Sequence, residues 1–281
     1  MAVRITSDST CDLNAIVEER NIGIMSMVVN LGDKTYHDGV DITPTDIFEF
    51  VAKTNVLPKT AAPSIGEYEE FFKKELEGYD ELVHINISSK SSGSYNFAKE
   101  AASGFGGKVH VIDSKALSSG QGLLVMRACD LRDAGKSAEE IEEDLLEVRE
   151  RINTSFVPDN LEYLYKGGRV SGMVKTVASM FKIHPLIEMD DGQLVPGKNY
   201  RGKMSVLIKQ YVEDLKAKYP NYDKTRCFIT HSTAEPELVE AAKEKVKEIF
   251  DFDEVIETVA GSIITSHCGK GTLGVLFVYN K

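Results

Sequence analysis

The sequence predicts an α/β protein of two domains: a mostly parallel, three-layer N-terminal domain and an α/β C-terminal domain with a mixed sheet. Strand-like and helix-like runs alternate through the first half of the chain, which is typical of a parallel sheet covered by helices. Near residue 153 the pattern changes to strands that follow one another across turns. The 281 residues suffice for two ordinary domains with a sizeable core. We therefore predict one domain over residues 1–153 and a second over residues 154–281.

Helix-start signals divide the first half of the chain. The stretch TPTDIFEFVAK (43–53) has a threonine N-cap, a proline at the first helical position and an aspartate in the first turn. The pairs Ser64/Glu67 and Ser137/Glu140 have the spacing of a capping box, which predicts that helices begin there. The remaining predicted elements are strands at 2–6, 22–31, 81–87 and 108–113 and helices at 95–102 and 120–134.

The second half is read from turns and short apolar runs. The stretch HPLIEMDDGQLVPG (184–197) predicts a β-hairpin across Asp191-Gly192, a pair of residues favoured in two-residue turns. Further strands are predicted at 154–158, 225–232, 253–261 and 272–280, with helices at about 201–219 and 235–250.

Composition excludes several classes of protein. The formal net charge of −11 argues against nonspecific binding to nucleic acid, because contact with a phosphate backbone needs a basic surface. The four cysteines are far apart and include no C-x-x-C pair, so we expect neither a zinc knuckle nor a redox dithiol. The N-terminus does not resemble a signal peptide and no run approaches the ~18 apolar residues of a membrane span. We expect a cytoplasmic protein with reduced thiols and no transmembrane segment.

The stretch INISSKSSGSY (85–95) is the first candidate site. Its five serines, which surround Gly93, are Ser88, Ser89, Ser91, Ser92 and Ser94. Ligands of α/β sheets sit beyond the carboxyl ends of strands, where a following helix offers free backbone N–H groups. Gly93 permits close approach to the backbone, and the hydroxyls of Ser92 and Ser94 are further donors. We interpret the stretch as a socket for a carboxylate or phosphate, or alternatively as a helix cap in a solvated loop.

Two further segments carry cationic or titratable candidates. In HCGKGTLG (267–274), His267 lies beside glycines before the last strand. It is interpreted as a donor to an anion or a proton shuttle, or alternatively as an incidental residue of a tight turn. Residues 163–204 form a basic island in an acidic chain, and Arg169 and Arg201 each lie beside glycine in a turn of it. Such an island suits a phosphorylated ligand or an acidic partner, or it is merely solubilising.

The stretch SDSTCDL follows the first predicted strand. Asp8 and Ser9 end that strand where a site is expected, although Ser9 and Asp12 equally suit turn and cap roles. A Ser92–His267–Asp8 hydrolase triad stays open as an alternative, without a G-x-S-x-G motif to support it. No His/Cys/Asp cluster has metal-ligand spacing, so we expect no metal site.

Seven segments, in order along the chain, carry a resemblance to a known family. They are TSDSTCDL (6–13), PKTAAPS (58–64), ISSKSSGSYNFA (87–98), VIDS (111–114), LEYLYKGGRVSG (161–172), KNYRGK (198–203) and HCGKG (267–271). Together they span nearly the whole chain. In this order they resemble the DegV family of fatty-acid-binding proteins, the FakB-type subunits of bacterial fatty acid kinase.

The resemblance implies a fatty acid in the cleft between the two domains, with its acyl chain in an apolar tunnel. It implies a carrier with no cofactor or ATP site, which is not catalytic alone. A separate FakA-type kinase phosphorylates the bound fatty acid to an acyl phosphate for phospholipid synthesis. By position, Thr60 and Ser92 match residues that contact the carboxylate. The Gly93 amide and Ser94 lie beside them, and His267 matches a histidine near the head group.

The resemblance also gives roles to the arginines: Arg169 and Arg201 match residues associated with the phosphorylated head group or with kinase docking. It further allows transient contact with a membrane. Candidates for the tunnel lining, or alternatively for an ordinary helix core, are Met173, Met180, Phe181 and Ile183. A serine acyl hydrolase, a phosphotransferase similar to dihydroxyacetone kinase, and a binder of another small carboxylate or phosphate metabolite stay open as alternatives.

Overall fold

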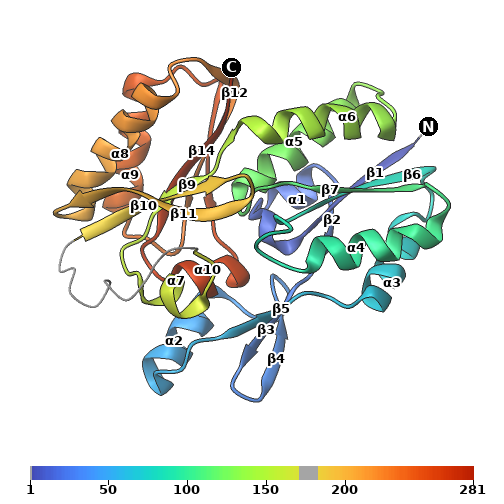
Figure 1. Cartoon of the computed structure of the whole chain (residues 1–281), viewed down its shortest axis with the longest axis horizontal. Helices are drawn as coiled ribbons and strands as arrows, with labels where there is room; N and C mark the ends of the chain where they lie inside the picture. Colours follow the sequence, from blue (N-terminus) through green and yellow to red (C-terminus); the bar gives the residue numbers. More distant parts are fainter. Residues whose placement is uncertain (1, 171–182) are drawn as a thin grey trace.

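The structure is a computed structural model, which describes residues 2–170 and 183–281. Its described strands form three sheets, of four, seven and three strands (Figure 1). The predicted combination of a parallel N-terminal sheet and a mixed C-terminal sheet is confirmed. Short 3-10 turns occur at Ser9–Cys11, Ser103–Phe105 and Arg149–Arg151.

The first sheet is parallel throughout. Its strands, in spatial order, are β2 (Gly23–Met25), β1 (Val3–Asp8), β6 (Glu81–Asn86) and β7 (Val109–Asp113). The helices α3 (Ile65–Glu75) and α4 (Ser94–Ala102) pack on one face, and α5 (Ser119–Asp133) and α6 (Ala138–Val148) pack on the other. Along β6, Leu82 joins the first core whereas Val83 and Ile85 join the second, as the alternation of side chains along a strand requires. This is the predicted three-layer arrangement.

Capping boxes begin three helices. Ser64 and Glu67 begin α3, and Ser137 and Glu140 begin α6, as predicted. Thr43 caps α2 (Pro44–Thr54), again as predicted, and exchanges hydrogen bonds with Asp46 in a capping box of its own. A short helix, α1 (Ile16–Glu19), links β1 to β2.

The second sheet is mixed. Its strands, in spatial order, are β11 (Gln193–Arg201), β10 (Ile183–Asp190), β9 (Ser155–Val157), β14 (Leu273–Tyr279), β12 (Tyr222–His231) and β13 (Glu254–Val259), and β8 (Ile152–Asn153) also pairs with β14. The predicted hairpin across Asp191-Gly192 joins β10 to β11. The helices α8 (Met204–Lys218) and α9 (Pro236–Ile249) cover one face. The boundary between residues 153 and 154 stays a prediction, and β8, just before it, already belongs to the second sheet.

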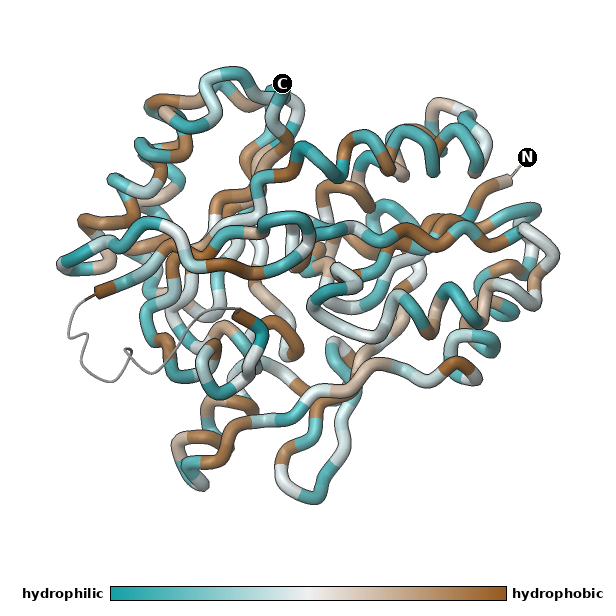
Figure 2. Tube along the Cα trace, in the orientation of Figure 1, coloured by the Kyte–Doolittle hydropathy of each residue, from teal (hydrophilic) through white to brown (hydrophobic). Residues whose placement is uncertain are grey.

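The helix α5 connects the two large sheets. Phe228 of β12 and Leu276 of β14 join the same hydrophobic core as the buried side chains of α5 and the β1 residue Ile5. Residues 123–126 of α5 are all buried, as expected of a helix that packs on more than one side. Figure 2 shows hydrophobic residues concentrated on the central strands, whereas the outer helices alternate between hydrophobic and hydrophilic residues.

A third sheet differs from the sequence prediction. The run 22–31, predicted as one strand, breaks at Ser26, whose hydroxyl donates to the carbonyl oxygen of Asp38. The residues after the break form β3 (Val28–Leu31), which pairs with β4 (Lys34–His37) and β5 (Lys59–Ala61). The helix α10 (Ser262–Cys268), also not predicted, packs on this small sheet through Ile263. Its seven residues are rich in β-branched side chains, so helix propensity gives no signal there.

Two helical glycines give a test of this packing. An added Cβ at Gly122 of α5 would lie 2.7 Å from the carbonyl oxygen of Cys11, whereas at Gly66 of α3 it would meet nothing within 4 Å. We expect Gly122→Ala to lower the free energy of unfolding by about 1–3 kcal/mol through overpacking. Gly66→Ala is the matched control and should raise it by about 0.5–1 kcal/mol through helix propensity. Urea unfolding of both variants measures the difference, and an unchanged or stabilised Gly122→Ala would contradict the close contact.

Candidate ligand-binding site

A cavity of about 70 Å³ lies where the loops of the sheets meet α10. Polar side chains from four separate segments reach it: Thr60 from β5, Ser91 and Ser92 from the loop after β6, Arg169 from the segment after α7 (Glu162–Gly167), and His267 from α10. The rest of its wall is apolar and includes Met27, Ile87, Leu117, Leu164, Leu194, Ile263, Ile264 and Cys268. The cavity wall is therefore mostly apolar and carries a few polar side chains.

The serine loop, which we define as residues 87–93, joins β6 to α4. The hydroxyl oxygen of Ser92 accepts a hydrogen bond from the amide of Ser94 at 3.2 Å, at the start of α4. A hydroxyl that accepts in this way still has its own proton to donate. Ser92 thus combines the two interpretations of the sequence, because it both supports the helix start and lines the cavity.

Two predicted residues of this segment lie outside the cavity lining. Ser94 is fully buried, and its hydroxyl contacts the Tyr68 hydroxyl at 2.5 Å and the Asn86 amide at 3.3 Å. Gly93 is exposed and begins α4 without a side-chain cap. Ser94 therefore holds α4 against the sheet, and Ser91, which the sequence analysis did not single out as a donor, lines the cavity instead.

His267 faces Thr60 across the cavity. Its Nε2 atom lies 2.8 Å from the Thr60 hydroxyl oxygen, and its Nδ1 atom is buried with no hydrogen-bond partner among the described residues. Gly167 comes so close that an added Cβ would lie 2.9 Å from Nδ1. Burial, with a smaller contribution from the Arg169 charge, lowers the pKa of His267 to about 4. The imidazole is therefore neutral at pH 7. When Nε2 carries the proton, it donates to the Thr60 hydroxyl oxygen, and the Thr60 hydroxyl can donate its own proton to another group.

The two predicted arginines are separated. Arg169 is exposed at the edge of the cavity, where its Nη1 donates to the carbonyl oxygen of Gly167 at 2.7 Å. Arg201 lies at the exposed end of β11, opposite Ile183, and does not line the cavity. Within the basic island, ion pairs offset two lysine charges, since Lys166 pairs with Glu162 and Lys198 pairs with Asp214.

Two buried carboxylates position α10, and the sequence interpretation missed their role. Asp12 accepts hydrogen bonds from the Gly261 amide at 2.8 Å and the Ser118 hydroxyl at 2.5 Å. Asp38 accepts from the Ser262 amide at 2.7 Å and the Ser9 hydroxyl at 2.8 Å. Burial raises the pKa of both carboxyls above the usual range for aspartate, most strongly for Asp12. The turn role expected for Asp12 and Ser9 is thus part of a contact between distant segments.

The sequence analysis also did not predict which residues form the apolar wall of the cavity. Ile263, Ile264 and His267 have the spacing of one helical face, which would have shown it had α10 been predicted. A second cavity of about 30 Å³ shares Leu117, Ile264 and Cys268 with the first. Of the predicted tunnel residues, Met173, Met180 and Phe181 lie outside the described residues, and Ile183 does not line either cavity.

The hydrolase triad is not assembled. Asp8 is fully buried, and its carboxylate accepts hydrogen bonds from Thr10, Asn86, Ile87 and Gln121. His267 Nε2 contacts Thr60, and the Ser92 hydroxyl oxygen accepts from a backbone amide. Within residues 2–170 and 183–281, no group of three or more His, Cys, Asp or Glu is arranged to hold a metal ion. No helix of the described chain is long and apolar enough to cross a membrane.

The fold and the site define a class: an α/β protein with a parallel and a mixed sheet and a mostly apolar cavity that has hydroxyl and imidazole groups at its wall. The chain belongs to the DegV family, since the family model, described as an uncharacterised protein of the DegV family, matches residues 2–280. A DegV domain-containing protein of Clostridium acetobutylicum is 30% identical over 279 residues, which cover 98% of each chain.

Solved structures of the family have the same fold. A fatty-acid-binding DegV family protein from Thermus thermophilus is 27% identical and superimposes over 100% of both chains with a TM-score of 0.92. A DegV lipid-binding protein from Thermotoga maritima is 28% identical, with a TM-score of 0.87 over 100% of both chains. DegV of Bacillus subtilis, a fatty-acid-binding protein, is 26% identical, with a TM-score of 0.86 over 100% of both chains.

The lowered pKa of His267 gives a test of the site's electrostatics. In ¹⁵N NMR, we expect the His267 imidazole to stay neutral down to about pH 5, since its pKa of about 4 lies below the ordinary 6.5. His110 is an internal control, because its hydrogen bond to Glu142 raises its pKa. As the pH falls, His267 binds a proton in the unfolded chain at a higher pH than in the folded protein. The free energy of unfolding should therefore decrease as the pH falls from 6.5 towards 4. Titration of His267 near pH 6.5 would contradict its burial.

Proposed function

We propose that this protein binds a long-chain fatty acid, with the carboxylate held by Thr60 and Ser92 and the acyl chain among the apolar side chains of the cavity. The observation that carries the proposal is the convergence of Thr60, Ser92 and His267, from segments far apart in the chain, on a mostly apolar cavity. The T. thermophilus, T. maritima and B. subtilis relatives, described as fatty-acid- or lipid-binding proteins, support the same ligand class.

The expected free energies indicate different roles for the apolar wall and for the polar groups of the site. A buried CH₂ contributes ~0.8 kcal/mol, so a sixteen-carbon chain has on the order of 10 kcal/mol of gross transfer free energy. A hydrogen bond to a charged group adds roughly 1.5–3 kcal/mol, and association costs offset much of the total. The apolar wall therefore sets the affinity, whereas Ser92 and Thr60 select the carboxylate and fix its orientation.

The second cavity suggests a path for the acyl chain. Leu117, Ile264 and Cys268 line both cavities, so a chain that displaces these side chains passes from the first cavity into the second. The far wall is formed by residues such as Phe156 and Leu276 of the second sheet. This path places the carboxylate at the serine loop and the methyl end beneath the strands β9 and β14.

The finer part of the proposal is that the bound fatty acid is presented to a FakA-type kinase and leaves as an acyl phosphate for phospholipid synthesis. Neutral donors suit this role, because a carboxylate held without a buried ion pair remains able to accept a phosphoryl group. In this proposal Arg169, exposed beside the cavity, meets the added charge, and Arg201, also exposed, meets the partner. In this proposal the protein is a carrier and is not catalytic alone.

Lipid extraction tests the ligand class. We expect mass spectrometry of the purified protein to detect about one fatty acid per chain, released by denaturation. Ser92→Ala should weaken fatty-acid binding about tenfold or more, because it removes a hydrogen bond to a charged group. Ser103→Ala is the matched control, since its exposed hydroxyl bonds only to the carbonyl oxygen of Glu100 among the contacts we describe. An empty protein that hydrolyses acyl esters would overturn the proposal, and full binding by Ser92→Ala would overturn the role of Ser92.

Substitution of Arg201 tests the presentation to a kinase. Since Arg201 is exposed and outside the cavity lining, Arg201→Ala should bind fatty acid as the wild type does. With a purified FakA-type kinase and ATP, the same variant should give at least tenfold less acyl phosphate. Lys209→Ala, which removes an exposed cation of α8, is the control and should leave both measurements unchanged. Lost fatty-acid binding by a folded Arg201→Ala, or unchanged phosphorylation, would contradict this division of roles.

A further inference from the structure

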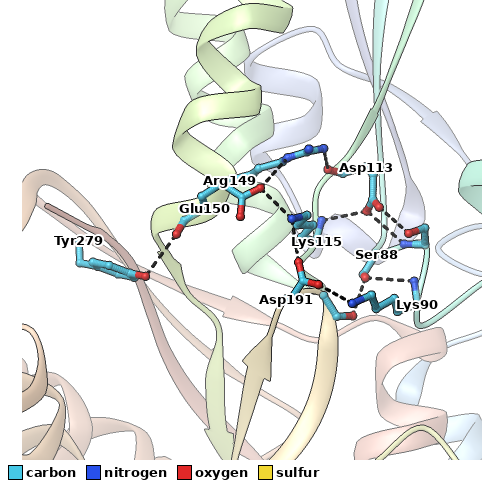
Figure 3. Close-up of polar contacts among 10 residues, drawn as sticks. Ser88, Lys90, Asp113, Lys115, Arg149, Glu150, Asp191 and Tyr279 are labelled. Carbon is cyan, nitrogen blue, oxygen red and sulfur yellow. Dashed lines mark hydrogen bonds and ion pairs between the residues drawn. The ribbon is translucent and has the colours of Figure 1, made fainter. Parts of the chain in front are cut away.

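The turn between β10 and β11 contacts the serine loop from the opposite sheet (Figure 3). The Ser88 hydroxyl donates to the carbonyl oxygen of Gly192 at 2.6 Å. Beside this hydrogen bond, the Asp191 carboxylate pairs with Lys90 at 2.6 Å and with Lys115 at 2.8 Å. Lys90 and Ser88 belong to the serine loop, so the turn holds this loop at two points.

Gly192 fits the loop too closely for any larger residue. Its φ is +81°, a conformation that L side chains rarely adopt, and an added Cβ would lie 2.7 Å from the Ser88 hydroxyl oxygen. The same Cβ would also be in van der Waals contact with the backbone of Lys115, at 3.5 Å. The turn is thus closely packed against this part of the chain, in addition to being hydrogen-bonded to it.

Ser88 links the turn to the cavity wall through backbone hydrogen bonds. Its carbonyl oxygen accepts hydrogen bonds from the amides of Ser91 at 2.9 Å and Ser92 at 3.1 Å, and both residues line the cavity. Its hydroxyl oxygen also accepts from the Lys90 amide at 3.3 Å. The position of Ser88 therefore determines where the two cavity-lining serines lie.

The hairpin itself reaches the same cavity. Leu194, two residues after Gly192, lines the same cavity as Ser91 and Ser92. The contact is extended by Asp113 of β7, which accepts from the Ser89 amide at 3.1 Å, and by Glu150, just before β8, which pairs with Lys115 at 2.9 Å. One short hairpin thus contributes an apolar side chain to the cavity and supports the polar loop beside it.

The hydrogen bond outweighs the ion pairs in this contact. The side chains of Asp191 and Lys90 are 61% and 47% exposed, and exposed ion pairs contribute little because water screens them. Ser88 is fully buried, and loss of a partner there leaves a polar group desolvated without compensation. The ion pairs orient the turn, and the hydrogen bond with the close fit of Gly192 holds the loop.

We propose that the Asp191-Gly192 turn is a positioning element for head-group recognition: through Ser88, it holds Ser92 where a carboxylate is bound. This inference rests on the proposed function and deepens it, because it places the selectivity for an acid in a contact between the two sheets. Neither Gly192 nor Ser88 touches the ligand in this scheme, and both act through the backbone of the serine loop.

The first experiment needs no ligand. Amide hydrogen exchange of ligand-free protein is compared among wild type, Gly192→Ala, Ser88→Ala and Gly135→Ala. Gly135→Ala is the matched control, since Gly135 has a φ of +79° but no atom within 4 Å of an added Cβ. We expect the amides of Ser91 and Ser92 to exchange about fivefold faster in the first two variants, and as in wild type in the control. Wild-type exchange in both Gly192→Ala and Ser88→Ala would overturn the proposal.

The second experiment separates positioning from general destabilisation. Binding of palmitic acid and of the corresponding alcohol, hexadecanol, is measured for the same proteins. The ratio of the two affinities should fall about fivefold in Gly192→Ala and Ser88→Ala, with hexadecanol binding unchanged. Equal losses for acid and alcohol would identify a merely structural role and overturn the proposal.

If wild type bound neither ligand, the proposed function would fail, whereas the exchange experiment would still decide whether the turn holds the serine loop. If Gly192→Ala did not fold, Ser88→Ala, which keeps the turn's backbone, would decide both measurements.

Discussion

The site depends on the hydrogen bonds that Asp12 and Asp38 accept from the first amides of α10. This short helix carries Ile264, His267 and Cys268, which form walls of the cavity, so its position decides the shape of the site. The two carboxylates lie in loops next to the first and third sheets, so they tie α10 to parts of the chain more than two hundred residues away. Burial of these carboxyls raises their pKa values and is costly, and the amides of Gly261 and Ser262, together with the hydroxyls of Ser118 and Ser9, offset part of that cost.

The same burial decides the chemical character of the site. Because His267 is neutral, the polar groups around the proposed carboxylate position are hydroxyls and an imidazole. Arg169, the cation that the described residues contribute to the cavity, stays at its exposed edge. A buried cation would bind a carboxylate more tightly but would also incur the desolvation cost of an ion pair. Neutral donors give orientation at a smaller cost, and they leave the apolar wall to supply most of the binding free energy.

How much could be predicted from the sequence follows from the range of each interaction. The capping boxes at Ser64 and Ser137 and the Asp191-Gly192 turn act within a few residues, so their patterns are visible in the chain and are confirmed. The helix α10 and the break at Ser26 were missed because distant partners impose both. The resemblance named Thr60, Ser92 and His267, and the structure brings these three to one cavity. It could not separate Ser94 from Ser91, since which serine faces inward depends on the packing of α4 against Tyr68.

These observations together explain why a site with so few polar groups is spread over so much of the chain. Thr60 belongs to the third sheet, the serine loop to the first, and Leu194 to the second, so no single element contains the geometry of the site. An apolar ligand needs only a space of suitable shape, but a carboxylate needs donors at fixed distances. In the proposed site, two contacts fix those distances: Ser88 with Gly192 joins the first and second sheets, and Thr60 with His267 joins the third sheet to α10. In the proposed function, recognition of the head group is therefore a property of how the sheets are assembled, whereas accommodation of the chain is a property of the core that they enclose.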